Sequence, residues 1–519
     1  MSASNQDPWF RNLRLEPPFR LSKRISSTQS SANFRSVACF PWNKRSIETF
    51  WPGNLAEQHA SPWAKIVDKY WDAVAVGAED CQPLEPLIEA DKICLAWTVV
   101  HSAPTQPLLV FSRGSLLYIY SFEQAGIAGY LRGHGGAITS IEVHPTRKFL
   151  VCTTSRDHSA RIYDLAQTPA LGPSNPHWPP MPKGTMSLAG PAHGLHMNQP
   201  EGSGIGRCIT VLMGGRSGGH NGAVLGAAFH RHLPLIATCG MDRTVKIWAI
   251  RANRKETEEH IIREDKPLFS TGRIHKARVL SVAWLQDDVL VSHSAAAFMR
   301  KEPGSNKRKE TYFEPGQMAV WRWLGMNRFF PPGFEDKQRD MPLRGCVSDY
   351  QDSSSFKIIT VYAYDSVQDQ LIVPQVSVFQ SPTLDPLLFS TIPGAREFLI
   401  TNIAILEPRK MPSFAEAFPH LVREMEAGGS GLETVTERLR IGGNELGDSD
   451  AEDEPLPPAI KIPSHTFEPA TLRQASWPVL LRDDDKATLN CTCMAFGGRC
   501  IVGVGSKGTL WVWTLKQGV

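Results

Sequence analysis

The sequence lacks several features that mark whole classes of proteins. No stretch of its 519 residues approaches the roughly 18 apolar residues that a membrane-spanning helix requires, so we expect no membrane contact. The N-terminus, MSASNQDPWFRNLRLEPPFR, has no apolar core of a signal peptide, and secretion is therefore not expected. The formal net charge is only +3, which gives no strong field to attract nucleic acid or anionic lipid. We therefore predict no direct sequence-specific binding of nucleic acid.

The cysteines also form no pattern that is typical of a metal site or of a disulfide framework. Ten cysteines are spread along the chain without a Cys-x-x-Cys pair, and Cys491 and Cys493 flank a single threonine. This pattern favours reduced thiols in an intracellular compartment and gives no metal-binding signature. The apolar fraction of 42% and the charged fraction of 21% are those of an ordinary soluble globular protein. We expect neither a metal nor a cofactor.

Two segments of the chain repeat one pattern. They span residues 133–164 and 219–248, and each begins with Gly-His followed by a short alternating strand. A second strand follows, then a turn with an aspartate, and then a third strand that ends in an aromatic residue. The histidine precedes the aspartate by 23 residues in the first repeat and by 22 in the second. This register is typical of WD repeats, which form the four-stranded blades of a β-propeller.

The register predicts a hydrogen-bonded tetrad in each blade. In a WD repeat the histidine, a hydroxyl residue on the second strand, the turn aspartate and the third-strand aromatic residue form a chain that locks the blade. The two predicted tetrads are His134, Thr153, Asp157 and Tyr163, and His220, Thr238, Asp242 and Trp248. We therefore interpret the two histidines as structural residues rather than as metal ligands or catalytic bases.

Weaker copies of the pattern extend the prediction to the rest of the chain. Strand-like runs occur at residues 93–121, 274–321, 356–407 and 489–513. The sequence therefore predicts an all-β protein, a seven-bladed WD40 β-propeller with long loop insertions and an N-terminal extension. Pairing of the N-terminal arm with the C-terminal strand would close the ring and remove exposed sheet edges.

The domain prediction is one propeller with additions. The predicted parts are a flexible or partner-ordered tail at 1–35, a single propeller at 36–519, and insertions within it at 165–207, 297–316 and 408–465. The first insertion is rich in proline, glycine and serine, and the second is basic. The third contains a capping box, Ser413-x-x-Glu416, which with the apolar spacing that follows predicts a helix over 413–426.

Catalytic and metal-binding motifs match the sequence only in their residue letters, without the neighbouring elements or ligands that such sites need. Gly215 to Gly219 reads G-x-S-x-G with Ser217 as nucleophile, but a nucleophile elbow needs a strand before it and a helix after it. This segment instead leads into a WD repeat, which favours a turn over a hydrolase. His230 and His232 have no third ligand at suitable spacing. We therefore expect no enzyme.

The repeats resemble one WD40 family in particular. The runs LRGHGGAITSIEVHPTRKFLVCTTSRDHSARIYDL and GGHNGAVLGAAFHRHLPLIATCGMDRTVKIWAI are similar to consecutive blades of the EED, or extra sex combs, family. The likeness covers about residues 90–325 and returns at about 487–515. It implies a nuclear, non-catalytic subunit of Polycomb repressive complex 2 that acts in gene silencing with the other subunits. One propeller face would bind and activate a SET-domain methyltransferase through a helix, and the complex would methylate histone H3.

The resemblance also implies a second site, on the opposite face, where an aromatic cage binds the trimethyl-lysine of the histone H3 tail. The four family positions correspond here to Phe40, Val99, Ile358 and Ile359. Aliphatic side chains lack the aromatic face that attracts a cation by roughly 0.5–2 kcal/mol. A register shift of a few residues would bring Tyr362 or Tyr364 to the pore as substitute aromatics. The prediction is therefore a mostly degenerate cage, with the histone H3 tail as a further partner only if substitute aromatics complete it.

A different class of function stays open at this point. WD40 propellers also serve as substrate receptors of ubiquitin ligases and as other protein-interaction adaptors. The run from Cys239 to Asp242, which reads Cys-Gly-Met-Asp, and the order of the blades favour the methyltransferase complex.

Overall fold

Strands dominate the chain, and most of them pair in small antiparallel sheets. The structure is a computed structural model, and it describes residues 8–13, 16–28, 32–50, 54–79, 93–100, 106–171, 200–214, 218–250, 261–300, 311–331, 351–364, 371, 373–408, 470–482 and 486–516. Residue contacts divide the chain into two units, residues 1–407 with 470–519, and residues 408–469. The second unit overlaps the predicted insertion at 408–465, and the helix predicted at 413–426 lies outside the described residues.

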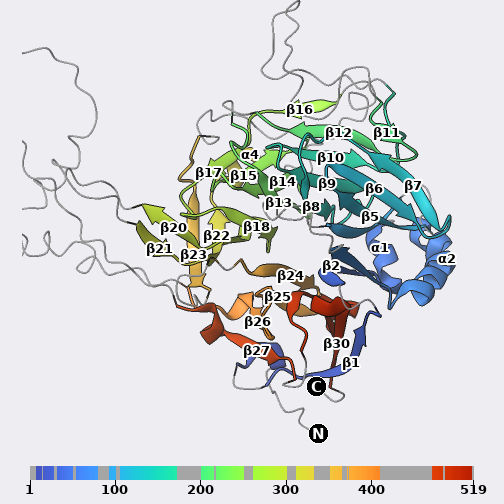
Figure 1. Ribbon diagram of the computed structural model, residues 1–519. Coiled ribbons are helices and arrows are strands. Elements are labelled where there is room, and N and C mark those ends of the chain that lie inside the picture. The colour runs from blue at the N-terminus through green and yellow to red at the C-terminus, as the bar shows by residue number, and fades with distance from the viewer. Residues whose placement is uncertain are drawn as a thin grey trace, which may run out of the picture. The chain divides into compact units, whose positions relative to one another are not determined.

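Three sheets follow one another in the first half of the chain (Figure 1). The first has the order β11-β7-β6-β5-β4, with β4 Leu95–Val99, β5 Pro107–Arg113, β6 Leu116–Ser121, β7 Gly126–Leu131 and β11 Gly202–Ser203. The second has the order β16-β12-β10-β9-β8, with β8 Ile138–Val143, β9 Leu150–Ser155, β10 Ala160–Asp164, β12 Arg207–Leu212 and β16 Ile262–Glu264. The third has the order β13-β14-β15-β17, with β13 Val224–Phe229, β14 Leu235–Gly240, β15 Val245–Ala249 and β17 Phe269–Thr271.

Three more sheets come from the second half of the chain. The fourth has the order β18-β19-β22-β23, with β18 Val279–Trp284, β19 Val289–Ser294, β22 Gln317–Trp323 and β23 Phe356–Ala363. The fifth has the order β24-β25-β26-β27, with β24 Gln375–Ser381, β25 Leu384–Thr391, β26 Glu397–Asn402 and β27 Ser476–Leu480. The sixth has the order β1-β30-β29-β28, with β28 Leu489–Ala495, β29 Cys500–Gly505, β30 Thr509–Leu515 and β1 Phe19–Ser26.

The blades stack face against face, and this explains the burial of their second strands. Every residue of β9, β14 and β19 is buried, although a strand with one solvated face would alternate. Separate hydrophobic clusters join neighbouring sheets, such as the cluster in which Ile162 of the second sheet accompanies Ile236 of the third. Strands that are buried on both faces have sequences such as LIATCG, in which β-branched and small residues pack on each face.

A two-stranded sheet lies between the sixth sheet and the first. It consists of β2 Asn33–Cys39 and β3 Val74–Glu79. On one side, the Asn490 amide of β28 donates to the Asn33 side chain at 2.7 Å and to the Phe34 carbonyl at 2.8 Å. On the other side, the Trp97 indole of β4 donates to the Ala38 carbonyl at 3.0 Å. In the described part of the chain the ring thus holds six sheets of four or five strands and this shorter one. The β-propeller is as predicted, but seven four-stranded blades are not confirmed.

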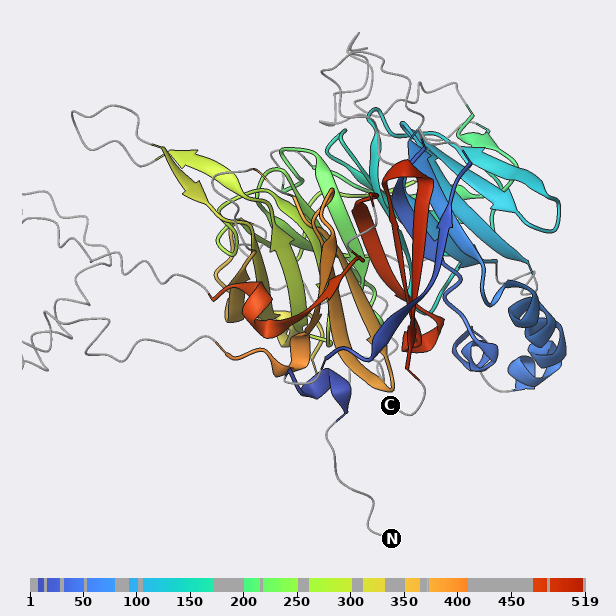
Figure 2. The same ribbon diagram turned by 60° about the horizontal axis from the view of Figure 1, so that its bottom comes forward.

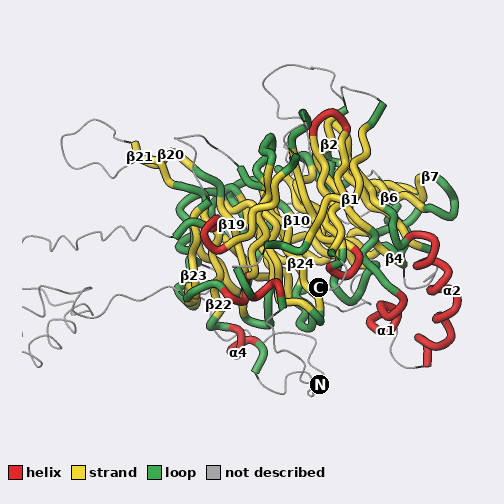
Figure 3. Tube along the Cα trace, turned by 90° about the horizontal axis from the view of Figure 1, so that it is seen from below, coloured by secondary structure: helices red, strands yellow, loops and turns green. Residues whose placement is uncertain are grey.

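A helical segment that the sequence analysis missed connects β2 to β3. It contains α1 Ile47–Phe50 and α2 Asn54–Tyr70 (Figure 2). Trp63 of α2 is fully buried, and its indole donates to the Asn43 carbonyl at 3.0 Å. Figure 3 shows both helices beside β4 and β6. Neither they nor the short α4, Met326–Phe329, has the length and apolarity to cross a membrane, and this holds for every helix among the described residues.

The predicted insertion at 297–316 is in part a regular hairpin. Strands β20 Ala297–Arg300 and β21 Thr311–Glu314 pair with each other and project away from the fourth sheet (Figure 2). The basic residues 301–310 between them lie outside the described residues. Of the predicted insertion at 165–207, residues 172–199 also lie outside them, while β11 adds an outermost strand to the first sheet.

The N-terminal segment closes the ring. Strand β1 pairs antiparallel with β30, from Phe19 opposite Leu515 to Ser26 opposite Thr509, as the sequence predicted for ring closure. Before it, Trp9 is buried with its ring 5.3 Å from that of Phe19 and 5.6 Å from that of Trp477. A tail over residues 1–35 is therefore wrong for these segments. Most residues of β1 are exposed, because β1 is the outermost strand of its sheet, whereas its partner β30 alternates between buried and half-buried residues.

Removing the Trp9 side chain tests the contribution of this segment to ring closure. We expect Trp9→Ala to lower the free energy of unfolding by about 3 kcal/mol, because it leaves a cavity between the fifth and sixth sheets. Chemical denaturation of the full chain measures the loss. Leu13→Ala is the matched control, since Leu13 is 42% exposed and its loss should stay within about 0.5 kcal/mol. Equal effects of the two changes would contradict a structural role for Trp9.

Candidate interaction site

The first predicted tetrad is assembled at one end of the second sheet. His134 precedes β8, and its Nε2 lies 2.7 Å from the Thr153 Oγ1 on β9. Its Nδ1 lies 2.9 Å from Asp157 Oδ2 in the turn that follows β9. Tyr163 is buried on β10 and makes a side-chain hydrogen bond with Thr153. The structure therefore brings these four residues together.

The second predicted tetrad has the same geometry in the third sheet and a defined direction. The Trp248 indole N–H donates to Thr238 Oγ1 at 2.8 Å. The Thr238 hydroxyl proton is then available for His220 Nε2, which is 2.8 Å away. His220 Nδ1–H in turn donates to the Asp242 carboxylate at 3.0 Å. Each group is thus satisfied with a neutral imidazole and an ionised carboxylate.

A third, incomplete tetrad that the sequence analysis missed lies in the fourth sheet. His275 Nε2 is 2.7 Å from Ser292 Oγ, and the Trp321 indole donates to the same oxygen at 3.0 Å. Ala296 stands four residues after Ser292, where the other tetrads have aspartate. His275 Nδ1 is buried and has no hydrogen-bond partner among the described residues. The spacing from His275 to Ser292 was visible in the sequence, but the missing aspartate hid it.

Burial keeps these histidines neutral. It lowers the pKa of His134 and His220, although the neighbouring aspartates oppose this, and it lowers that of His275 to about 3. For Asp157 and Asp242, burial alone would raise the pKa, but the hydrogen-bonded histidine and the other donors hold it well below the ordinary value. The tetrads therefore couple the stability of three neighbouring sheets to pH.

We expect the stability to fall on acidification. A histidine that is neutral in the folded protein but takes up a proton near pH 6.5 when unfolded costs about 1.3 kcal/mol of stability between pH 7.5 and pH 5.5. Thermal and urea unfolding at a series of pH values measure the slope. His232→Ala is the control, because His232 is exposed and its loss should leave the slope unchanged. A stability that stays flat down to pH 5.5 would contradict neutral buried histidines.

The aspartate of the second tetrad supports a further test. Asp242→Ala removes the acceptor of His220 Nδ1 and of the Asn221 N–H, so we expect a loss of about 2–3 kcal/mol in the free energy of unfolding. Asp287→Ala is the matched control, because the Asp287 side chain is 67% exposed, and His230 makes its hydrogen bond to the Asp287 backbone carbonyl at 3.0 Å while the carboxylate lies 3.8 Å away. We expect it to change the stability by less than about 0.5 kcal/mol. Denaturation of both variants decides the question, and similar losses would show that the tetrad adds nothing specific.

Two of the four predicted cage positions lie together but are buried. Phe40 follows β2 and is 1% exposed, and Val99 at the end of β4 is 3% exposed. The Phe40 ring packs edge-on against Trp42 at 5.2 Å and Trp97 at 5.4 Å, and Tyr70 of α2 lies beside it. This aromatic cluster is the hydrophobic core beneath α1 and α2. Phe40 therefore serves packing and presents no open face to a ligand.

The other two cage positions are not brought to this place. Ile358 and Ile359 lie on β23, the outermost strand of the fourth sheet, and they pack in two further clusters. Tyr362 is on the same strand and Tyr364 follows it, and both are buried at 7% and 6% exposure. The assignment of Ile358 and Ile359 to cage positions, and of Tyr362 or Tyr364 as substitute aromatics, stays a prediction.

The next candidate residue, His230, makes hydrogen bonds to backbone groups. His230 Nε2 lies 3.0 Å from the Asp287 carbonyl, and its Nδ1 accepts from the backbone N–H groups of His232 and Leu233. Among the described residues no group of three or more histidines, cysteines and carboxylates could hold a metal ion. Ser217 lies outside the described residues.

Comparison with known proteins agrees with this geometry. The family "WD domain, G-beta repeat" matches residues 127–164 and 206–249, which contain both complete tetrads. The chain is 25% identical over 253 residues to "Polycomb group protein FIE1" of Zea mays, which covers 46% of the chain and 45% of that protein. It is 26% identical over 186 residues to "Polycomb protein EED" of Chaetomium thermophilum, covering 36% of the chain and 26% of that protein. The chain thus aligns with less than half the length of these relatives.

A solved structure extends the fold comparison to nearly the whole chain. A chain of apo Polycomb repressive complex 2 from Chaetomium thermophilum, in an autoinhibited state, superposes with a TM-score of 0.54. The match covers 96% of this chain and 98% of that one at 16% identity, and therefore supports the fold alone. The sequence relatives confirm the resemblance to the EED family.

Proposed function

We propose that this chain, which is similar to the Polycomb proteins EED and FIE1, is a non-catalytic nuclear subunit of a Polycomb repressive complex. It binds a helix of a SET-domain methyltransferase on one propeller face and activates methylation of histone H3. The observation that carries the proposal is the sequence likeness to Polycomb proteins of a plant and a fungus. WD repeats alone would fit many adaptors, whereas these relatives are all Polycomb proteins.

The fold suits a binding platform. Three adjacent sheets are held by buried hydrogen-bonded histidines, so the loops at their ends are anchored on rigid strands. Docking of a partner helix on loops that are already ordered costs less conformational entropy than docking on loops that become ordered only on binding. This supports a scaffold that presents a fixed surface to the methyltransferase.

Reading of trimethyl-lysine has been lost in this chain, in our proposal. A methylammonium cage needs several exposed aromatic faces, and Phe40, Tyr362 and Tyr364 are each less than a tenth exposed. Val99 contributes no aromatic face, and Ile358 lies on an outermost strand. Another subunit would then recognise the methylated histone.

Calorimetric titration tests the loss of the cage. We expect no difference between trimethylated and unmethylated histone H3 tail peptides when either is added to the folded full chain. Circular dichroism of the same sample serves as the folding control. Micromolar binding that requires the methyl groups would contradict the loss and show that other aromatic residues form a cage.

The partner is tested by purification from the organism itself. We expect tagged full-length protein, isolated from nuclei, to bring a SET-domain methyltransferase with it in near-equal amount, as measured by quantitative mass spectrometry. A ubiquitin-ligase receptor would instead bring a cullin adaptor. Recovery of the cullin adaptor without the SET-domain protein would overturn the proposed function.

A further inference from the structure

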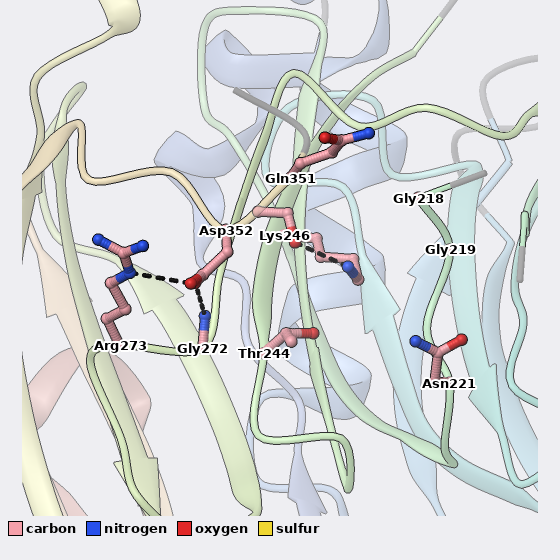
Figure 4. Close-up of a pocket in the computed structure, with 10 residues that line it drawn as sticks. Gly218, Gly219, Asn221, Thr244, Lys246, Gly272, Arg273, Gln351 and Asp352 are labelled. Atoms are coloured by element: carbon pink, nitrogen blue, oxygen red, sulfur yellow. Dashed lines mark hydrogen bonds and ion pairs between the residues drawn. The ribbon is translucent and has the colours of Figure 1, made fainter. Parts of the chain in front are cut away.

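A pocket opens beside the second tetrad, at one end of the third sheet. Its volume is about 340 Å³. The lining side chains that matter here are Asn221, Thr244, Lys246, Ser270, Arg273 and Asp352. Figure 4 shows Lys246 between Asp352 on one side and Asn221 on the other. The chain segments that meet here are the loop before β13, strands β15 and β17, and the segment before β23.

Lys246 is a buried cation with unused hydrogen-bonding capacity. It is 5% exposed, and its Nζ donates to the Ser270 hydroxyl at 2.7 Å. That hydroxyl is its one partner among the described residues, although an ammonium has three N–H donors. Burial lowers the pKa of Lys246 to about 8, against the attraction of Asp242 and Asp352. A buried ammonium without a paired anion costs free energy that a bound anion would offset.

The carboxylates near Lys246 are engaged elsewhere. Asp352 accepts from Arg273 Nε at 2.8 Å and from the Gly272 N–H at 3.0 Å. Asp242 accepts from His220 and from the Thr244 hydroxyl. Neither forms an ion pair with Lys246 in the described part of the chain. The cation therefore faces the pocket rather than an internal partner.

We propose that this pocket binds the carboxylate of an acidic side chain from a partner polypeptide. Lys246 supplies the positive charge, and the Asn221 amide across the pocket supplies a further donor. Arg273 adds little, since Asp352 already neutralises it. The proposal goes beyond the methyltransferase partnership and does not depend on it.

A single carboxylate fits better than a nucleic-acid backbone. The pocket offers a ligand one unpaired cation, Lys246, because Asp352 already neutralises Arg273. A polyanion needs an extended positive field, which the whole chain with its net charge of +3 also lacks. One carboxylate needs only the one buried ammonium and its neighbouring donors.

Competitive acetylation of the full chain tests the pocket. The probe is the capped tripeptide acetyl-Gly-Glu-Gly-amide, whose one carboxylate is the side chain, and the control is the glutamine tripeptide at equal ionic strength. Mass spectrometry follows the acetylation rate of each lysine at pH 7. We expect the glutamate peptide to slow the reaction of Lys246 saturably by about tenfold, since pairing with a carboxylate raises an amine pKa by about one unit.

The controls separate a site from general screening. Exposed Lys357 of β23 should keep its rate with both peptides. Asn221→Ala should require more glutamate peptide for the same fractional protection of Lys246, measured against that variant's own rate without peptide. No protection by the glutamate peptide, equal protection by the glutamine peptide, or no acetylation of Lys246 at all would overturn the proposal. Stronger protection by inorganic phosphate than by the glutamate peptide would overturn the choice of a carboxylate.

Discussion

Closure of the ring is the constraint on which the rest of this structure depends. The second, third and fourth sheets bury both faces of their second strands, so an open ring would expose apolar faces of neighbouring sheets. The chain closes the ring with β1, which pairs with β30 at the opposite end of the sequence. The aromatic cluster around Trp9 and the ion pair of Arg11 with Asp385 at 2.8 Å fasten the segment before it to the fifth and sixth sheets. The fixed positions of the surface loops follow from this closure.

Buried polar groups then specify how each blade is held. The second tetrad directs its hydrogen bonds from indole to hydroxyl to imidazole to carboxylate, which leaves none of these groups unsatisfied. Where Ala296 replaces the aspartate, His275 keeps one nitrogen without a partner among the described residues. Lys246, beside the second tetrad, also has N–H donors without a partner among the described residues, but it faces a pocket rather than the interior. A ligand from outside can complete its surroundings, which is why this residue is a candidate for binding.

The sequence predicted those contacts that form between residues close together along the chain. The tetrad residues lie within about 30 positions of one another, and the strand geometry of a blade converts that spacing directly into contact. The pairing of β1 with β30 joins segments nearly 500 residues apart, so sequence spacing could not predict which of their residues lie opposite each other. Ile358 and Ile359 follow a long insertion, so spacing does not fix their register, and their assignment to the cage stays a prediction. The pocket at Lys246 was invisible because its lining comes from four separate segments.

Reconstitution of methyltransferase activity gives the decisive test of the proposed function. The SET-domain methyltransferase that is proposed as the partner is assembled with and without this chain, and methylation of histone H3 in nucleosomes is measured. We expect a large rise in methylation when the chain is added, and no methylation by the chain alone. A rate that does not change when the folded chain is added, although the SET-domain protein is active, would contradict the account.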